Sequence, residues 1–156
     1  MHVSSIMSRN VTTVTPKTTL RHLWKLIFEL HIHAIPVINE KKKVIGMVAK
    51  ADLIKPPYPD YEEYVEDFMS ASDFEKMEAR LDELSGLTAE KLMSKRVVFA
   101  RPETPIMRAL SRMIVHHVDQ LPIIHDEETV VGVITKGDIF AALFKNHFGK
   151  KEKKKK

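Results

Sequence analysis

The sequence predicts an α+β protein built from two related copies of one folding unit, with a helical insertion between them. The first observation is a self-similarity that needs no gap. Residues 6–54 align with residues 92–140 at a constant offset of 86, and 12 of the 49 aligned positions are identical. The second is the same order of local patterns in both copies: strand, helix, strand, strand, helix. Because 156 residues with 44% hydrophobic content supply one modest core, we expect the copies to pack together with pseudo-two-fold symmetry.

The composition excludes several classes of protein. There is no cysteine, so disulfides, thiolate metal sites and a cysteine nucleophile are ruled out, and an intracellular compartment is favoured. No apolar run approaches the roughly 18 residues of a membrane span. The first five residues lack the features of a signal peptide. We therefore expect a cytoplasmic protein without a membrane partner.

The net charge of +4 is unevenly distributed along the chain. Residues 60–90 contain eleven acidic and two basic side chains, which leaves 23 basic and ten acidic side chains elsewhere. Residues 145–156 contain seven lysines and one glutamate, with only Phe148 for apolar burial. This composition predicts a disordered Lys-rich tail.

In the first copy, the β-branched run Val11–Val14 predicts a strand that ends before Pro16. A helix follows, capped by Thr18 or Thr19. Its apolar stripe has helical spacing and consists of Leu20, Leu23, Trp24, Ile27 and Phe28. Two short apolar runs, Ile35–Ile38 and Val44–Val48, then predict strands joined by a polar turn. A second helix is expected to start near Asp52.

The second copy repeats this order. Val97–Phe99 predicts the leading strand, and Thr104–Pro105 opens a helix with proline at its first position. Its expected apolar stripe consists of Ile106, Leu110, Met113 and Ile114. The two strands correspond to Leu121–Ile124 and Val130–Thr135, and the last helix should run from about Gly137 to Phe144.

Between the copies, residues 56–87 predict two short amphipathic helices. One apolar face comprises Tyr61, Tyr64, Val65, Phe68 and Met69; the other comprises Phe74, Met77, Leu81 and Leu84 and ends at Ser85–Gly86. We expect these faces to pack on the repeats or on a second copy of the chain; a surface for an external partner is the alternative.

Four motifs occur twice in the same order: an opening Met-Ser, a Thr-x-Leu or Thr-Pro-Ile helix start, an apolar-Pro-apolar strand at Pro36 and Pro122, and a Gly-x-x-(Thr)-x-x-Asp ending. This pattern resembles the cystathionine β-synthase (CBS) domain, and two in tandem resemble a CBS pair, or Bateman module. The resemblance divides the chain into CBS repeat 1 (1–55), the acidic insertion (56–87), CBS repeat 2 (88–144) and the tail (145–156). It implies a regulatory protein that binds adenine nucleotides or S-adenosyl ligands between the repeats and forms a homodimer.

Thr135 and Asp138 form the candidate site that the residues themselves suggest. They lie where a strand ends and a helix begins, so that a hydroxyl group and free backbone N–H groups face outward together, which suits a phosphate. The two carboxylate oxygens of Asp138 match the two hydroxyl groups of a ribose. The alternative is a capping box, which many helices form without any ligand.

The two repeats differ at this motif, because Ala49 replaces Thr135 while Asp52 matches Asp138. The resemblance implies that each cleft mixes both repeats, so that Thr135 and Asp138 would be joined by Ile32 and His33. The resemblance also places Val133 at the base pocket, with Thr18 close enough to contribute. A weaker second site would join Asp52 to Val118 and Asp119, and the carboxylate of Asp119 would repel phosphate where a histidine would attract it.

The histidine clusters His31-x-His33 and His116-His117 suggest a metal site at first sight. Each falls near a predicted helix C-terminus, where a donor side chain favours the free carbonyl groups, and no carboxylate lies at a ligand spacing. We therefore expect no metal. No nucleophile-and-base pair or phosphate-binding glycine loop is present in the sequence, so we expect no enzyme activity.

These observations predict a stand-alone sensor that binds AMP, ADP or ATP, mainly at the second-repeat motif, and regulates a protein that the sequence does not identify. An S-adenosyl ligand is an alternative, as is a purely structural pair that dimerises without ligand. Nucleic-acid binding through the Lys-rich tail is the least favoured, because residues 149–156 contain no aromatic side chain that could stack on bases and give specificity.

Overall fold

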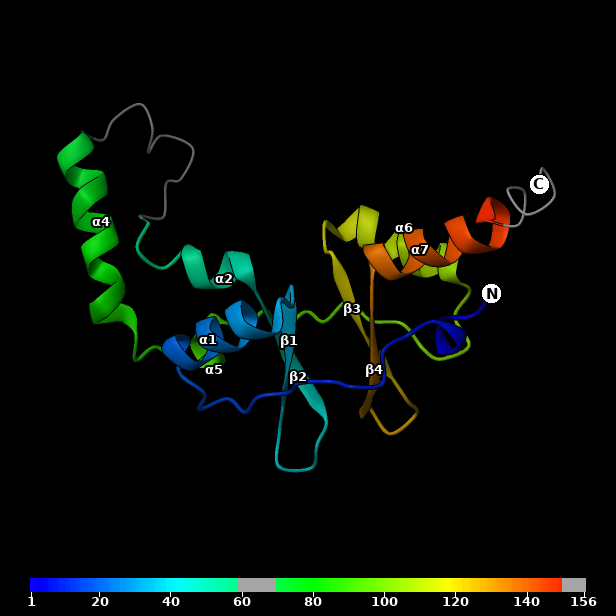
Figure 1. Ribbon diagram of the computed structural model, residues 1–156. Helices are drawn as coiled ribbons and strands as arrows, with labels where there is room; N and C mark the ends of the chain where they lie inside the picture. The colour runs from blue at the N-terminus through cyan, green and yellow to red at the C-terminus, as the bar shows by residue number, and fades with distance from the viewer. Residues whose placement is uncertain (59–69, 150–156) are drawn as a thin grey trace. The chain divides into compact units, whose positions relative to one another are not determined.

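The computed structural model describes residues 1–58 and 70–149 and contains short helices and two-stranded sheets (Figure 1). In chain order the elements are the 3-10 turn η1 (Val3–Ser5), α1 (Leu20–Leu30), β1 (Ala34–Ile38), β2 (Val44–Ala49), α2 (Lys50–Ile54), α4 (Ala71–Leu84), α5 (Ala89–Leu92), α6 (Ile106–His116), β3 (Gln120–Ile124), β4 (Val130–Thr135) and α7 (Lys136–His147). In one sheet β1 pairs with β2, and in the other β3 pairs with β4. The predicted α+β class is confirmed.

The duplication extends to the backbone of the elements. Strands β1 and β2 and helix α1 correspond to β3, β4 and α6 at the same offset of 86, with equal lengths. Both copies place a histidine in the left-handed region at the end of the first helix, with φ of 52° at His31 and 54° at His117. The hairpin turns repeat this, with φ of 62° at Lys42 and 63° at Glu128. The two repeats therefore share one backbone plan.

The leading strand of each repeat is reduced to a single parallel bridge, Val14 to Val37 and Ala100 to Ile123. Val14 donates its N–H to the Pro36 carbonyl (3.0 Å) and accepts from the Ile38 N–H (2.9 Å). The pairing stops there because Pro36 has no N–H to donate and Pro16 turns the chain two residues later. The predicted strands Val11–Val14 and Val97–Phe99 are wrong as extended ladder segments.

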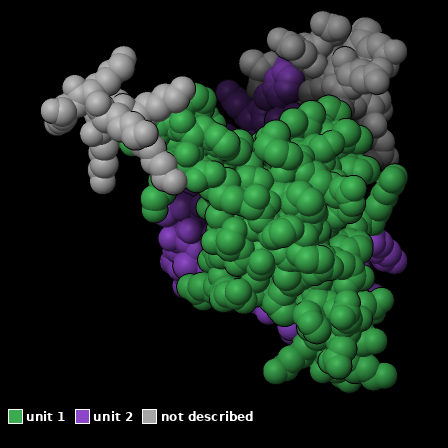
Figure 2. Space-filling view, turned by 90° about the vertical axis from the view of Figure 1, so that its right-hand side faces the viewer, with its two compact units in different colours: residues 1–12, 40–44, 96–156 green, residues 13–39, 45–95 purple. Residues whose placement is uncertain are grey.

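The chain divides into two compact units that do not coincide with the repeats (Figure 2). Among the described residues, unit 1 comprises residues 1–12, 40–44 and 96–149, and unit 2 comprises residues 13–39, 45–58 and 70–95. The opening segment of repeat 1 thus belongs to the unit that contains most of repeat 2, and the opening of repeat 2 belongs to the other. The repeats exchange their first segments.

Backbone hydrogen bonds hold the exchanged segment in each unit. Within unit 1, Ser8 and Val133 donate backbone N–H groups to each other's carbonyl groups at 2.9 Å in both directions. Within unit 2, Ser94 and Met47 do the same at 2.9 and 3.0 Å. Ser94 is Ser8 plus 86, and Val133 is Met47 plus 86, so the exchange is reciprocal.

The exchange also explains two of the identities between the repeats. A side chain at Gly132 would place its Cβ 2.7 Å from the Met7 sulfur and 2.9 Å from the Ser8 carbonyl oxygen. Met93 lies in the same way against Gly46. Each exchanged methionine therefore needs a residue without a side chain on the strand that it covers.

Each unit has its own core. The core of unit 1 is formed by Val3, Ala100, Ile106, Ala109, Met113, Leu121, Ile123, Ile134 and Ile139. The core of unit 2 is formed by Val14, Leu20, Leu23, Ile27, Ile35, Val37, Val48, Leu53 and Ala89. Val3 and Ala89 come from the exchanged segments, so each repeat completes the core of the other unit.

The helices match the predicted periodicity only in part. Thr19 caps α1, since its hydroxyl oxygen accepts the His22 N–H (3.3 Å). Within the predicted stripes, however, Phe28 is 72% exposed and Ile114 is 58% exposed. Helix α7 is longer than predicted and ends at His147.

The start of α6 differs from the prediction by one position. Pro105 precedes the helix as its N-cap, with ψ of 138°, and is not the first helical residue. The Thr104 hydroxyl does not cap the helix, because its oxygen accepts the N–H of Arg101 (2.9 Å). Proline restricts the residue before it to extended backbone, which keeps Thr104 outside the helix.

In the insertion, α4 confirms the second predicted helix and ends at Leu84, followed by Ser85 as its C-cap. Met77 is buried on this helix. The first predicted helical face, Tyr61 to Met69, lies outside the described residues, as does the tail from residue 150 onward. Over residues 1–58 and 70–149, no helix is long and apolar enough to cross a membrane.

The exchanged contact yields a stability prediction. Gly132→Ala should lower the free energy of unfolding by about 1–3 kcal/mol, because the Ser8 carbonyl oxygen belongs to the backbone and cannot move aside as a methionine side chain can. Urea denaturation of the wild type and the variant measures the difference.

Gly86→Ala is the matched control, since an added Cβ there meets nothing within 4 Å and the φ of Gly86 is not positive. It should leave stability unchanged or raise it by about 0.4–1 kcal/mol. Equal losses in the two variants would contradict the role assigned to the exchanged segment.

Candidate functional site

The start of α7 presents Thr135 and Asp138 in a capping box. The Thr135 hydroxyl oxygen accepts the Asp138 N–H (3.1 Å), and Asp138 Oδ2 accepts the Thr135 N–H (2.8 Å). Both residues are half-buried. The capping box, which the sequence suggested as the alternative to a ligand site, is therefore formed.

The capping box leaves some polar atoms of Thr135 and Asp138 available to a ligand. The box uses Oδ2 of the carboxylate and one lone pair of the hydroxyl group. It does not use Oδ1 of Asp138 or the hydroxyl proton of Thr135. A ribose hydroxyl could therefore donate to Oδ1, and the Thr135 hydroxyl could donate to a phosphate oxygen, while the box stays closed.

Two further residues lie at this helix start. Lys136 donates its backbone N–H to the Asp119 carbonyl (3.2 Å), and its Nζ atom pairs with Asp119 Oδ1 at 3.3 Å. The pairing of β3 with β4 sets this arrangement, because Gln120 lies opposite Thr135 and Asp119 therefore sits beside Lys136. Val133 lies on the same strand opposite Pro122.

Lys136 was not recognised from the sequence as a site residue. Its ion pair places a positive charge against Asp119, the carboxylate that we expected to repel phosphate. The signal that could have found it is the hairpin register, since pairing Leu121 with Ile134 already brings positions 119 and 136 together.

Repeat 1 forms a reduced version of this site. Asp52 Oδ2 accepts the Ala49 N–H (2.7 Å). The alanine side chain has no oxygen that could accept the Asp52 N–H, so only half of the capping box exists. His33 is exposed, and its carbonyl accepts the Lys50 N–H (3.3 Å). Unit 2 thus brings His33 beside the helix start that carries Asp52.

The sequence-predicted ligand set is divided between the units. Thr135, Asp138, Val133 and Val118 belong to unit 1, whereas His33, Ile32, Thr18 and Asp52 belong to unit 2. Thr18 lies in the turn before α1, where its hydroxyl oxygen accepts the Thr15 N–H (3.2 Å). The joining of the two groups around one ligand stays a prediction.

The histidine clusters end helices, as expected from the sequence. His31 and His117 are the C-caps of α1 and α6, and His116 lies in the last turn of α6. Within the part of the chain that the structure describes, no group of three or more histidine, aspartate or glutamate side chains is arranged to hold a metal ion.

The family model described as the CBS domain matches residues 3–56 and 89–145, which together are most of the chain. The chain belongs to the CBS domain family. Both repeats are matched, and the insertion between them is not.

The curated relatives include whole proteins of similar length and larger enzymes. The chain is 25% identical over 154 residues to an uncharacterized protein of Methanocaldococcus jannaschii, with 92% of this chain and 91% of the relative covered. It is 26% identical over 138 residues to a homoserine O-acetyltransferase of Methanohalobium evestigatum, covering 88% of this chain and 23% of that enzyme. The chain therefore spans about a quarter of that enzyme.

Solved structures share the fold. CBSX2 of Arabidopsis thaliana, crystallised in complex with AMP, has a TM-score of 0.72 at 19% identity, with 94% of this chain and 98% of that chain covered. The CBS domain pair of protein MJ0100, in complex with 5′-methylthioadenosine and S-adenosyl-L-methionine, has a TM-score of 0.68 at 18% identity, covering 94% and 97%. At these identities the likeness establishes the fold alone.

The partial burial of the Asp52 carboxylate makes the stability of the protein depend on pH. Burial raises the pKa of Asp52 above its ordinary value of 3.8, although the Ala49 N–H bond and the charge of Lys55 act in the opposite direction. With a raised folded pKa, the folded state binds the extra proton, so the stability contribution is present at low pH and is lost as pH rises through the folded pKa. Asp52→Asn, whose amide oxygen still accepts from Ala49, should become more stable relative to the wild type as pH rises from about 4 to 7. Urea denaturation at both pH values measures this.

Asp73→Asn is a control of opposite sign. The side-chain and backbone hydrogen bonds from Ser70 lower the pKa of Asp73, so its contribution is present above the unfolded pKa and is lost as pH falls. This variant should lose stability relative to the wild type as pH rises through the acid range below about 4, and the difference should change little from pH 4 to 7. A difference for Asp52→Asn that shrinks or stays constant would refute the burial effect.

Proposed function

We propose that this chain is a regulatory module that binds an adenine nucleotide (AMP, ADP or ATP) at the start of α7. The observation that carries the proposal is the Thr135–Asp138 pair at the N-terminus of a 12-residue helix, with Asp138 Oδ1 and the Thr135 hydroxyl proton not used by the capping box. A helix start favours an anion, and the carboxylate selects a sugar with two adjacent hydroxyl groups.

The related structures support an adenosine-containing ligand. CBSX2 is in complex with AMP, and the MJ0100 pair is in complex with 5′-methylthioadenosine and S-adenosyl-L-methionine. Those ligands share adenosine and its ribose, which is the part that Asp138 would bind. They differ beyond the ribose, because AMP has a phosphate group there and S-adenosyl-L-methionine has a sulfonium cation. The hydroxyl group of Thr135 and the positive end of the helix favour the phosphate.

We propose one main site per chain, in repeat 2. Ala49 cannot donate to a phosphate, so the start of α2 offers a carboxylate without the hydroxyl group. Any regulation would follow from a difference in ligand affinity between two arrangements of the protein, and the regulated partner would respond to that change. We propose binding without catalysis; the acetyltransferase activity of the longer relatives is not carried over to this chain.

Nucleotide binding is tested by thermal denaturation of the full chain with AMP, ADP, ATP and S-adenosyl-L-methionine. A nucleotide at about 100 times its dissociation constant should add about 2.7 kcal/mol of stability. Asp138→Asn keeps an oxygen that can accept the Thr135 N–H but removes the charge, and it should abolish the shift.

Asp52→Asn is the matched variant in repeat 1 and should retain most of the shift. A shift with S-adenosyl-L-methionine alone would identify the alternative ligand class. No shift with any of the four ligands would refute the sensor and favour a structural pair.

We also propose a homodimer that involves α7. Phe140, Phe144 and Phe148 follow one another at intervals of four residues and are 75%, 55% and 60% exposed. The rings of Phe144 and Phe148 lie 6.1 Å apart, so the residues form a continuous apolar face. Such a face on a monomer marks an interaction surface.

Sedimentation equilibrium of the full chain should give twice the mass of one chain. Phe140→Ser with Phe144→Ser should shift the mass toward the monomer, because serine removes the apolar area that drives association. Tyr58→Ser changes an exposed aromatic residue of unit 2 and should leave the dimer intact. A monomeric wild type would refute the assembly.

A further inference from the structure

A separate pocket of about 550 Å³ lies within unit 1, between residues 96–105 and one side of α6. Its lining consists of Arg96, Val97, Val98, Phe99, Arg101, Glu103, Thr104, Pro105, Arg108, Arg112 and His116. None of Thr135, Asp138, Val133 and Val118 contributes to it, so the pocket is distinct from the start of α7. Its volume falls in the range of pockets that hold small molecules.

The pocket concentrates arginine. The chain has 25 basic residues, of which seven are arginine and 18 are lysine. Four of the seven arginines line this pocket, and no lysine is among its lining residues. Glu103 is its one carboxylate among those residues. Because a guanidinium group presents several donors in a planar fork that matches phosphate oxygens, this selection of arginine over lysine points to phosphate recognition.

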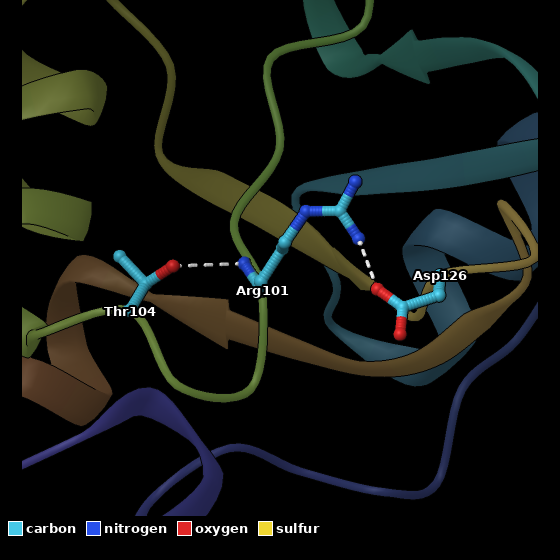
Figure 3. Close-up of polar contacts among 3 residues, drawn as sticks. All are labelled: Arg101, Thr104 and Asp126. Atoms are coloured by element: carbon cyan, nitrogen blue, oxygen red, sulfur yellow. Dashed lines mark hydrogen bonds and ion pairs between the residues drawn. The ribbon is translucent and has the colours of Figure 1, made fainter.

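Arg101 and Arg112 are held in place by their neighbours. Arg112 donates from Nη1 to the Phe99 carbonyl oxygen (2.8 Å). Arg101 donates from Nη1 to Asp126 Oδ1 (3.2 Å), and its guanidinium carbon lies 5.7 Å from the centre of the Phe99 ring. The Arg101 backbone is fixed as well, since its N–H donates to the largely buried Thr104 hydroxyl (Figure 3). Holding the cations before a ligand arrives lowers the entropy cost of binding.

The other repeat shows that the fold does not need these arginines. At the offset of 86, Arg96, Arg101, Arg108 and Arg112 correspond to Asn10, Thr15, His22 and Leu26. Repeat 1 forms the equivalent helix and bridge with none of them. The four arginines therefore occur in repeat 2 alone. A structural role that both repeats share does not explain them.

The spacing of the arginine and histidine side chains in the pocket defines the shape of the ligand. Arg108, Arg112 and His116 follow one another at intervals of four residues, so they form one row about 12 Å long on α6. Arg101 faces the same pocket from the preceding loop. A single phosphate would reach only part of this row, whereas linked phosphates can contact several of its members together.

We propose that this pocket binds a small anion with two or more linked phosphate groups. The phosphate chain can come from an inorganic polyphosphate or from a nucleoside polyphosphate, since both present the same linked oxyanions. The pocket volume of about 550 Å³ and the roughly 12 Å row of donor side chains match such a small anion better than a nucleic acid or an acidic protein segment, which would need an extended surface. The site acts independently of the nucleotide site at α7.

Isothermal titration calorimetry of the full chain with inorganic triphosphate, at constant ionic strength, tests the proposal. Triphosphate should bind with one site per chain and at least tenfold more tightly than inorganic phosphate. Arg108→Gln should weaken triphosphate binding at least tenfold. Among the described residues, the structure shows no hydrogen bond or ion pair of the Arg108 side chain, and the backbone N–H that donates to the Pro105 carbonyl (3.0 Å) is kept in the variant. This variant should therefore fold normally, and circular dichroism checks that it does.

Arg9→Gln is the matched control, because it removes the same charge from an exposed position of the same unit outside the pocket. It should change the affinity by less than about twofold, as expected for an exposed charge outside the pocket that salt screens. Equal weakening by Arg9→Gln and Arg108→Gln, or an absence of triphosphate binding, overturns the proposal. Arg108→Lys keeps the charge but removes the planar fork and should restore binding only in part; full restoration overturns the arginine-specific geometry.

Asp138→Asn separates this site from the nucleotide site. Triphosphate binding should persist in Asp138→Asn, and its loss there would assign the anion to the start of α7 and overturn the second site. If the Asp138→Asn variant binds ATP and the double variant with Arg108→Gln does not, the phosphate chain comes from a nucleoside polyphosphate. If the Asp138→Asn variant binds triphosphate but not ATP, the phosphate chain comes from an inorganic polyphosphate. Tighter, Arg108-dependent binding of a single-stranded oligonucleotide or a polyglutamate peptide overturns the small-anion assignment.

Discussion

The reciprocal exchange of opening segments is the constraint on which the rest of this structure depends. Val3 donates its N–H to the Thr104 carbonyl (2.9 Å), and at the equivalent positions Ala89 donates to the Thr18 carbonyl (2.7 Å). The same side chains, Val3 and Ala89, are fully buried in cores formed mainly by the other repeat. Neither repeat can therefore close its core alone, which explains why the fold occurs as a pair.

This exchange also holds the candidate site. Strand β4 is bonded through Val133 to Ser8 of the exchanged segment, and two residues later it ends at Thr135. The helix that carries Asp138 starts at the next position. Because the capping box closes across this junction, the orientation of the hydroxyl and carboxylate groups rests on the strand that the other repeat fixes. The contact that joins the exchanged segment to β4 therefore also fixes the geometry of the candidate site.

The two repeats provide an internal comparison of which features the fold requires. Both keep the methionine, the glycine that it covers, the left-handed histidine and the helix-start aspartate, so these belong to the shared architecture. Only repeat 2 has the threonine hydroxyl and the four-arginine pocket. Features in one copy alone are not needed for folding, and both of them present groups suited to phosphate. Both groups of residues that suit phosphate therefore belong to repeat 2.

The sequence by itself determined the duplication, the offset of 86, the order of the helices and hairpins, and the unequal Thr135 and Ala49, because these depend on local patterns and on direct comparison of the two copies. Only the tertiary structure decided that Phe28 and Ile114 are exposed, since periodicity identifies an apolar side of a helix but not whether a neighbour covers it. It also decided the exchange of the opening segments, the pairing of Lys136 with Asp119 and the convergence of Arg96, Arg101, Arg108 and Arg112. Each of these joins residues through long-range packing, and local propensity contains no information about which distant segment will complete a core.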